Sequence, residues 1–218
     1  MLKSKREYKT LDKVVYFSII KKINSGELKP NEHLTEERLS KELGVSRSPI
    51  RKAITALVAE GVLDYRTYSG VVVKDSIVDS TRYVQSLEVI ELFVKSTLEK
   101  IEQKETNIDT ADLRNYIHDM DRASYLKDID EYIFNQHQFF LKLISFSENP
   151  YYREMVKKVF FNLTYFAVDS VNQIPEEGRD RTIKHFTLIV DLLEAQKYQE
   201  VYVEVKNLLN EFVVNAFR

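Results

Sequence analysis

Several features of other protein classes are missing from this sequence of 218 residues. It has no cysteine, which excludes disulfides, thiolate metal sites and a cysteine nucleophile, and which fits a reducing compartment. No run of eighteen apolar residues is present to span a membrane, and the N-terminal Met-Leu-Lys-Ser-Lys-Arg lacks the apolar segment of a signal peptide. We therefore expect a cytoplasmic protein that does not enter a membrane.

Motifs that support catalysis or phosphate binding are also missing. The sequence has no Glu-x-x-His, no His-x3-His and no Gly-rich phosphate loop. A nucleophile with an adjacent base, a paired-carboxylate site or a metal would be needed for enzyme chemistry, and no spacing suggests one. We expect a protein that is not an enzyme, and an enzyme built on the C-terminal helices is the least favoured alternative.

Charge is distributed unevenly along the chain, although 32 Lys and Arg nearly balance 34 Asp and Glu. Residues 1–75 hold 15 basic and 10 acidic side chains, and the remainder holds 17 and 24. The first part can meet phosphates, and the acidic second part cannot. The length allows two domains of ordinary size, which we expect at residues 1–75 and 80–218.

The most informative stretch of the sequence runs from Leu34 to Gly61. Thr35 is a suitable N-cap, and two glutamates follow it in the first turn, where the helix dipole favours negative charge. Gly44 can end this helix with a positive φ, and Ser46 can cap a second helix two residues later. The pattern predicts a helix, a tight turn and a second helix.

The second of these helices has one apolar and one polar face. Pro49 is tolerated in its first turn, where a backbone N–H has no partner within the helix. The apolar residues recur at helical spacing: Ile50, Ala53, Ile54, Leu57 and Val58. The other face carries Arg47, Ser48, Arg51, Lys52 and Thr55. Arginine is the commonest reader of guanine edges, so this helix is expected to read a DNA major groove.

The flanking segments complete a winged helix-turn-helix. An apolar periodicity from Leu11 to Ile23 predicts a helix before Gly26 and Pro30. After Gly61, residues 62–67 and 71–74 are rich in β-branched side chains and surround a turn at 68–70, which predicts a hairpin that forms the wing.

This N-terminal part resembles the winged-helix domain of the GntR family of bacterial transcription regulators, from about Val14 to Val73. The resemblance rests on Ile20-x5-Gly26-x-Leu28-x-Pro30, on Leu39-x3-Leu43-Gly44-Val45-Ser46-Arg47-Ser48-Pro49-Ile50-Arg51-x-Ala53, and on Glu60-Gly61-Val62. Asn31 stands where the family usually has Gly, and Tyr68-Ser69 replaces the basic residues common at the wing tip. The DNA-contacting residues we expect are Arg38, Ser46, Arg47, Ser48, Pro49, Arg51, Lys52, Tyr68, Ser69 and Gly70.

The second domain is expected to be an all-α helical bundle, so the fold class is mainly α. Breaks in the periodicity predict six helices at about 80–103, 109–126, 128–147, 149–172, 178–196 and 198–217. Most of the aromatic side chains at helical spacing are expected in the core of this bundle.

The second domain is similar to the FCD domain of the FadR-type branch of that family, on Leu87-Glu88, Ser147-x-Asn149-Pro150 and His185. The resemblance implies a dimer contact and a pocket for an organic acid, often with a divalent metal held by one Asp and three His. The corresponding positions here are Gln136, Phe140, His185, and Asn207 or Leu208. His137 is one residue past Gln136, about 100° around a helix, and cannot simply substitute as a ligand.

With one imidazole left, a tight metal site is not expected and no cofactor is required. The polar residues expected to line the pocket are Gln136, His137, Arg153, Asn162, His185 and Asn207. The leading hypothesis is a homodimeric transcription regulator that binds a near-palindromic double-stranded operator and responds to a small molecule, such as an organic acid. The alternative is an adaptor whose winged helix binds protein instead of DNA.

Overall fold

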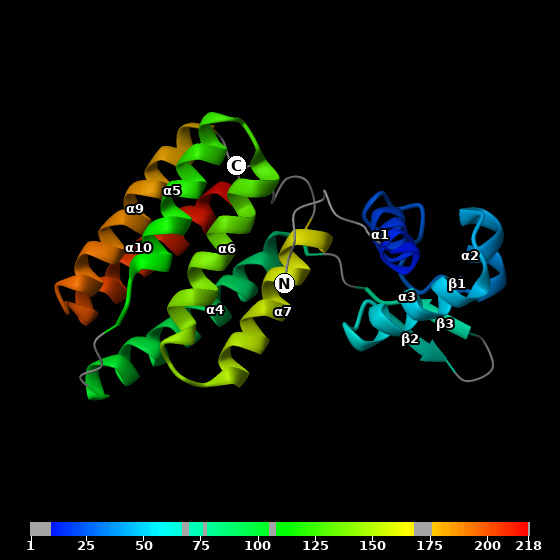
Figure 1. Cartoon of the computed structure of the whole chain (residues 1–218), viewed down its shortest axis with the longest axis horizontal. Coiled ribbons are helices and arrows are strands. Elements are labelled where there is room, and N and C mark those ends of the chain that lie inside the picture. Colours follow the sequence, from blue (N-terminus) through cyan, green and yellow to red (C-terminus); the bar gives the residue numbers. More distant parts are fainter. Residues whose placement is uncertain (1–9, 67–69, 76–77, 105–107, 168–175, 218) are drawn as a thin grey trace. The chain divides into compact units, whose positions relative to one another are not determined.

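The computed structural model describes residues 10–66, 70–75, 78–104, 108–167 and 176–217 (Figure 1). The chain divides into two compact units, residues 3–77 with 164–168 and residues 78–163 with 169–218. Among the described residues, no helix combines the length and apolar character needed to cross a bilayer.

The first unit is a winged helix-turn-helix, as the sequence predicts. Its elements, in chain order, are α1 (Leu11–Asn24), β1 (His33–Leu34), α2 (Glu36–Leu43), α3 (Arg47–Ala59), β2 (Leu63–Arg66) and β3 (Gly70–Val73). The three strands form one antiparallel sheet in the order β1-β3-β2. Because α1 and α2 both pack on α3, they hold it in place beside this sheet.

The sequence pattern did not predict strand β1. His33 pairs with Val72 and Leu34 pairs with Val71. A strand of two residues has no periodicity of its own, and its partner lies almost forty residues away, so no local signal announces it. Its pairing with β3 ties the segment before α2 to the sheet of the winged helix.

Asn31 precedes this strand and takes a left-handed backbone conformation, with φ of 66°. Asparagine tolerates that region better than most residues with a side chain, so it can stand where the family usually has Gly. The Asn31 amide donates to the Val73 carbonyl at 2.8 Å, and the Val73 amide donates to the Glu32 carbonyl at 3.0 Å. The departure from the family pattern therefore preserves the local backbone.

Gly70 begins β3 with φ of 84°. A Cβ at this position would lie 2.8 Å from the Leu34 carbonyl oxygen, which is backbone and cannot move aside easily. Both the conformation and the close approach of β1 require glycine here.

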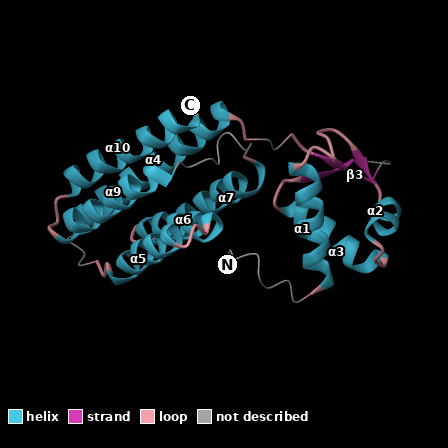
Figure 2. Ribbon diagram, turned by 90° about the horizontal axis from the view of Figure 1, so that it is seen from above, coloured by secondary structure: helices cyan, strands magenta, loops and turns pink. Residues whose placement is uncertain are grey.

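The second unit is the expected helical bundle. Its helices are α4 (Ser80–Lys104), α5 (Ala111–Tyr125), α6 (Ile129–Ser145), α7 (Pro150–Phe166, which belongs to this unit up to Leu163), α9 (Glu176–Glu194) and α10 (Tyr198–Ala216). Figure 2 shows α4, α9 and α10 along one side of the bundle and α5, α6 and α7 along the other. The predicted limits are mostly within two residues of these. The exception is the predicted helix 149–172, because α7 ends at Phe166 and residues 168–172 lie outside the described part of the chain.

Aromatic rings fill the interior of the bundle, as expected. The Phe139 and Phe186 rings meet edge to face with centroids 4.4 Å apart, and Phe140 lies 5.5 Å from Phe186 and 6.1 Å from Phe160. Polar contacts at the periphery join further helices, since Tyr202 on α10 donates to Glu91 on α4 at 2.7 Å. The core thus connects α6, α7 and α9 around one aromatic cluster.

Candidate functional site

The turn between α2 and α3 forms much as the sequence predicts. The Thr35 hydroxyl accepts a hydrogen bond from the Arg38 amide at 3.1 Å and so caps α2. Gly44 follows α2 with φ of 65°. Ser46 occupies the N-cap position of α3 but makes no side-chain capping bond, which leaves its exposed hydroxyl available to another partner.

Helix α3 buries its apolar stripe and exposes its polar face. Ile50, Ala53, Ile54 and Leu57 are buried, and Val58 is half-buried. On the opposite face the side chains of Arg47 and Arg51 are 65% and 69% exposed. Two guanidinium groups therefore stand at the exposed start of a helix that the core holds firmly.

Arg51 is held by a carboxylate of the preceding helix. Its Nε and Nη2 atoms donate to the two carboxylate oxygens of Glu36 at 2.9 and 3.0 Å. The hydrogen bonds from Arg51 lower the pKa of Glu36 below its ordinary value. A guanidinium has five N–H donors, so three of them, two on Nη1 and one on Nη2, are still available for a guanine edge. Arg47 lies at a longer distance, 3.6 Å, from Glu37.

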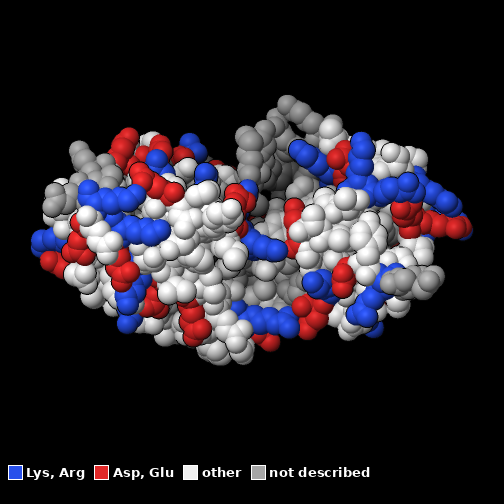
Figure 3. Space-filling view, turned by 90° about the horizontal axis from the view of Figure 1, so that it is seen from below, with Lys and Arg blue, Asp and Glu red and all other residues white. Residues whose placement is uncertain are grey.

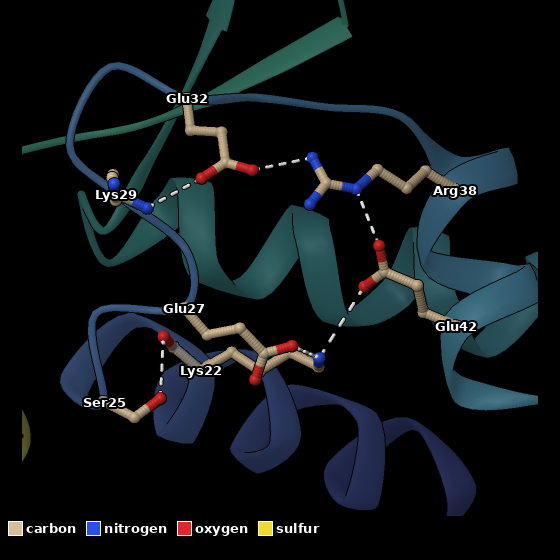
Figure 4. A network of polar contacts seen from close by, with 7 residues as sticks. All are labelled: Lys22, Ser25, Glu27, Lys29, Glu32, Arg38 and Glu42. Carbon is tan, nitrogen blue, oxygen red and sulfur yellow. Dashed lines mark hydrogen bonds and ion pairs between the residues drawn. The ribbon is translucent and has the colours of Figure 1, made fainter.

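Arg38, on α2, belongs to a network of polar contacts (Figure 4). Its guanidinium lies between two carboxylates and donates to Glu32 at 2.7 Å and to Glu42 at 2.7 Å. Glu42 also lies 3.7 Å from Nζ of Lys22 on α1. Arg38 therefore connects the segment before β1 to α2. This contact gives Arg38 a structural role in addition to the DNA contact that the sequence predicts.

The other expected DNA contacts that the structure describes lie on α3 and at the start of β3. Ser48 and Lys52 are exposed on α3, and Pro49 is half-buried in its first turn. Tyr68 and Ser69 lie outside the described residues, and Gly70 is exposed at the start of β3. Figure 3 shows basic and acidic side chains interspersed on the face that it presents. On α3 itself, Arg47 and Arg51 lie beside Glu37 and Glu36 of α2, so the surface expected to bind DNA carries both charges.

The second site is a cavity inside the helical bundle. Residues of α4, α6, α7 and α10 form its walls: Tyr83, Leu87, Ile90, Ile133, Gln136, His137, Phe140, Phe160, Leu163, Leu209 and Phe212. Two of the residues expected to line a pocket, Gln136 and His137, are in this set. They lie about 100° apart around α6, and both line the cavity.

The other expected pocket residues are elsewhere. Arg153 is exposed, Asn162 is half-buried, Asn207 is exposed, and none of these lines the cavity. Sequence reasoning found neither Tyr83 nor the apolar walls on α4 and α10, such as Leu87 and Leu209. Their helical periodicity marks them as core residues and does not distinguish a cavity wall from packed interior.

His185 is engaged by two carboxylates of α10 instead of facing the cavity. Its Nδ1 lies 2.5 Å from Glu204, and its Nε2 lies 3.4 Å from Glu211. Asn207 donates to the same Glu204 at 3.2 Å. Two glutamates seven residues apart share one face of a helix, and that spacing was the signal that could have indicated this cluster.

The metal site typical of the FCD branch does not fit these residues. Phe140 and Leu208 have no atom that can bind a metal, and both ring nitrogens of His185 face carboxylates. Within the described ranges, no group of three or more His, Asp or Glu side chains is placed to hold a metal ion. This donor set offers at most one of the four expected ligands, so we derive no function through a metal.

Comparison with known proteins agrees with this architecture. Residues 11–73 match the family described as bacterial regulatory proteins, gntR family, and residues 90–211 match the FCD domain. The solved structure of Lar, described as controlling expression of the Listeria monocytogenes agr system and mediating virulence, is 42% identical. It has a TM-score of 0.88, over 98% of this chain and 99% of that one.

Curated relatives are more distant. The uncharacterized HTH-type transcriptional regulator YdhC of Bacillus subtilis (strain 168) is 26% identical over 147 residues, 66% of this chain, and the match spans 64% of that protein. The regulator McbR of Escherichia coli (strain K12) is 23% identical over 183 residues, 80% of this chain and 78% of that protein. These relatives are transcription regulators rather than enzymes. The chain therefore belongs to the gntR family of bacterial regulatory proteins, with an FCD domain after its winged helix.

Proposed function

We propose that this protein is a homodimeric, cytoplasmic transcription regulator that binds a near-palindromic operator through α3 and responds to a small molecule in its helical bundle. The observation that carries the proposal is the exposed pair Arg47 and Arg51 at the start of a helix whose opposite face is buried. This is the arrangement with which a recognition helix enters a major groove.

Each expected contact has a distinct task on the DNA. Arg51 and Arg47 meet base edges or phosphates, and the Glu36 carboxylate fixes the plane of the Arg51 guanidinium. Hydroxyls of Ser46 and Ser48, with the positive end of the α3 dipole, meet phosphate oxygens. Lys52, Arg38 and the wing residues 68–70 supply further backbone contacts. Specificity then depends mainly on α3.

Two-fold symmetry and the effector complete the proposal. A symmetric dimer presents two copies of α3, so its operator contains two related half-sites. An effector can change operator affinity only if it binds the DNA-competent and DNA-incompetent dimers with different affinities. The cavity between α4, α6, α7 and α10 supports the placement of that effector in the bundle.

Titration of the full-length protein against a duplex that it selects from a random library tests the DNA interface. Arg51→Ala is expected to weaken operator binding by about 1–3 kcal/mol if Arg51 reads a base. If the variant loses as much affinity for random DNA as for the operator, and if the slope of log affinity against log salt concentration falls by about one, Arg51 contacts a phosphate.

Arg122→Ala is the matched control, because Arg122 is also an exposed arginine but lies on α5 of the bundle. It should leave both affinities unchanged. Operator binding that is insensitive to Arg51→Ala would remove Arg51 from the reading set. Binding to duplex DNA that does not respond to salt would favour the adaptor hypothesis. Native mass spectrometry reports the dimer directly.

A further inference from the structure

The cavity in the helical bundle has a volume of about 40 Å³. One water needs about 10–15 Å³ in this measure, so the space holds about three water-sized groups. Helices α4, α6, α7 and α10 supply its walls, and eight of its eleven lining residues are apolar. A molecule of about three or four non-hydrogen atoms fits this space without displacement of a helix.

No lining residue of this cavity carries a formal charge. Lysine, arginine, aspartate and glutamate are all missing from its walls. His137 is 6% exposed, its ring stacks on Phe160 with centroids 4.2 Å apart, and burial lowers its pKa to about 3. Burial also raises the pKa of Tyr83 above its ordinary value. The three polar side chains that line the cavity are therefore uncharged at neutral pH: Tyr83, Gln136 and His137.

A neutral cavity disfavours a charged ligand. A carboxylate that enters it gives up its water and finds neither a metal ion nor a basic side chain on the walls. The organic acid expected from the family resemblance is thus a poor match for these residues. An uncharged molecule avoids that desolvation penalty and gains contact with the aromatic and aliphatic walls.

Gln136 adds a specific polar requirement. Its side chain is 8% exposed, and its Oε1 atom is fully buried with no hydrogen-bond partner among the described residues. A buried acceptor without a donor is costly and is rarely left so in a native protein. Gln136 lines the cavity, so a small rotation of its side-chain amide would bring this oxygen to an N–H or O–H group of a ligand there.

We propose that the effector site of this protein takes a small, uncharged, largely apolar molecule, such as a short primary amide or alcohol, with one hydrogen-bond donor directed to Gln136. The inference rests on the proposed function, because it names the ligand class of the site assumed there. The side-chain carbonyl of Gln136 favours a ligand with an N–H or O–H group, and the small volume between the apolar walls limits its size. Because no basic side chain lines the cavity, carboxylates bind poorly.

Acetamide and acetate test the ligand class, because they have the same shape and differ in charge. We expect acetamide to shift the methyl NMR signals of Leu87, Leu163 and Leu209 in the full-length protein. We expect its affinity to exceed that of acetate by at least about ten-fold, since only acetate brings an unpaired charge into the cavity. Acetate that binds as tightly as acetamide, or acetamide that moves none of these signals, overturns the proposal.

Two substitutions on α6 test the role of the amide. Gln136→Leu removes the acceptor and keeps a side chain of similar size, so acetamide should bind about ten-fold more weakly. Gln138→Leu is the matched control, because Gln138 lies on the same helix, is half-buried and does not line the cavity. Equal losses in both variants, or no loss in Gln136→Leu, contradict the assignment.

Xenon keeps the test independent of folding defects. It needs no hydrogen bond, so xenon should shift the same leucine methyls in the wild type and in Gln136→Leu. Xenon that shifts none of them shows that the cavity is not open to ligands and overturns the proposal. Operator binding is measured separately: its loss in Arg51→Ala supports the proposed function whether or not acetamide binds.

Discussion

The two units of this protein place their functional polar groups in opposite environments. On the winged helix, Arg38, Arg47 and Arg51 are exposed, and each faces at least one glutamate. In the bundle, Gln136 and His137 are buried among apolar side chains and are uncharged. The first site selects its partner by charge and hydrogen-bond pattern, and the second selects by size and neutrality. One chain therefore uses two kinds of recognition, and four experiments test how separate they are.

The largest effect is expected for Phe140→Ala in the bundle. Phe140 is 1% exposed and contacts both Phe160 and Phe186, so its loss should reduce the free energy of unfolding by about 3–5 kcal/mol. Urea denaturation followed by near-ultraviolet circular dichroism measures this. Tyr151→Ala is the control, because that side chain is 79% exposed and its loss should cost little. Similar losses for both would mean that the aromatic cluster is not a packed core.

The next largest effect is expected at the start of the wing. Gly70→Ala combines a positive φ with a Cβ 2.8 Å from the Leu34 carbonyl oxygen, and we expect destabilisation of the winged helix by about 3 kcal/mol. Gly61→Ala is the matched control: Gly61 has φ of 78°, but a Cβ there meets nothing within 4 Å. It should cost only about 1 kcal/mol. Thermal unfolding of the two variants compares them, and equal costs would show that contact with β1 is unimportant.

The buried His137 makes the stability of the bundle depend on pH. Its pKa is about 3 in the folded protein against 6.5 ordinarily, so below pH 6.5 the unfolded chain takes up a proton that the folded chain does not. Stability therefore falls as pH decreases from 6.5, by about 2 kcal/mol at pH 5.

Urea midpoints between pH 5 and pH 7 measure this dependence, and His137→Phe should flatten it. His118→Gln is the control because His118 is exposed on α5, and the slope should survive there. An unchanged slope in His137→Phe would mean that other groups determine the acid sensitivity.

The smallest effect concerns the pairing of Glu36 with Arg51. Glu36→Gln removes a negative charge beside the DNA and loosens the Arg51 guanidinium. We expect random DNA to bind more tightly and the preference for operator over random DNA to fall by less than about ten-fold. Titrations of both duplexes at one salt concentration measure the ratio. Glu37→Gln, whose contact with Arg47 is longer at 3.6 Å, should change the ratio less. If both variants keep the wild-type ratio, Glu36 does not orient Arg51.

Local signals were enough to predict most of the first unit. Thr35, Gly44 and the apolar stripe on α3 act within one or two turns of a helix, so their spacing carries the structural information directly. Strand β1 was missed because its pairing with β3 depends on residues far apart in sequence. The same limit applies to Arg51: its exposure followed from periodicity, but its pairing with Glu36 required the relative placement of two helices.

The cavity was less predictable, because four helices build it. Gln136 and His137 were suspected as polar residues in an aromatic bundle, and both lie on its wall. Arg153 was also expected to line the pocket, but its side chain is exposed. That prediction failed because the polarity of a residue does not show whether it lies on the inner or the outer face of a helix. The carboxylates around His185 come from the neighbouring helix α10, and their effect on that imidazole depends on how α9 and α10 pack.

The glutamates beside the arginines of the winged helix also affect how quickly the protein finds its operator. At distances beyond a few ångströms, an arginine and a paired glutamate largely cancel each other's field, so the recognition surface attracts DNA less than its arginines alone would. Weak long-range attraction lowers the encounter rate and also shortens the time spent on unrelated sequences. The pairing of Glu36 with Arg51 thus favours a search in which the protein leaves wrong sites rapidly and full attraction develops only on contact.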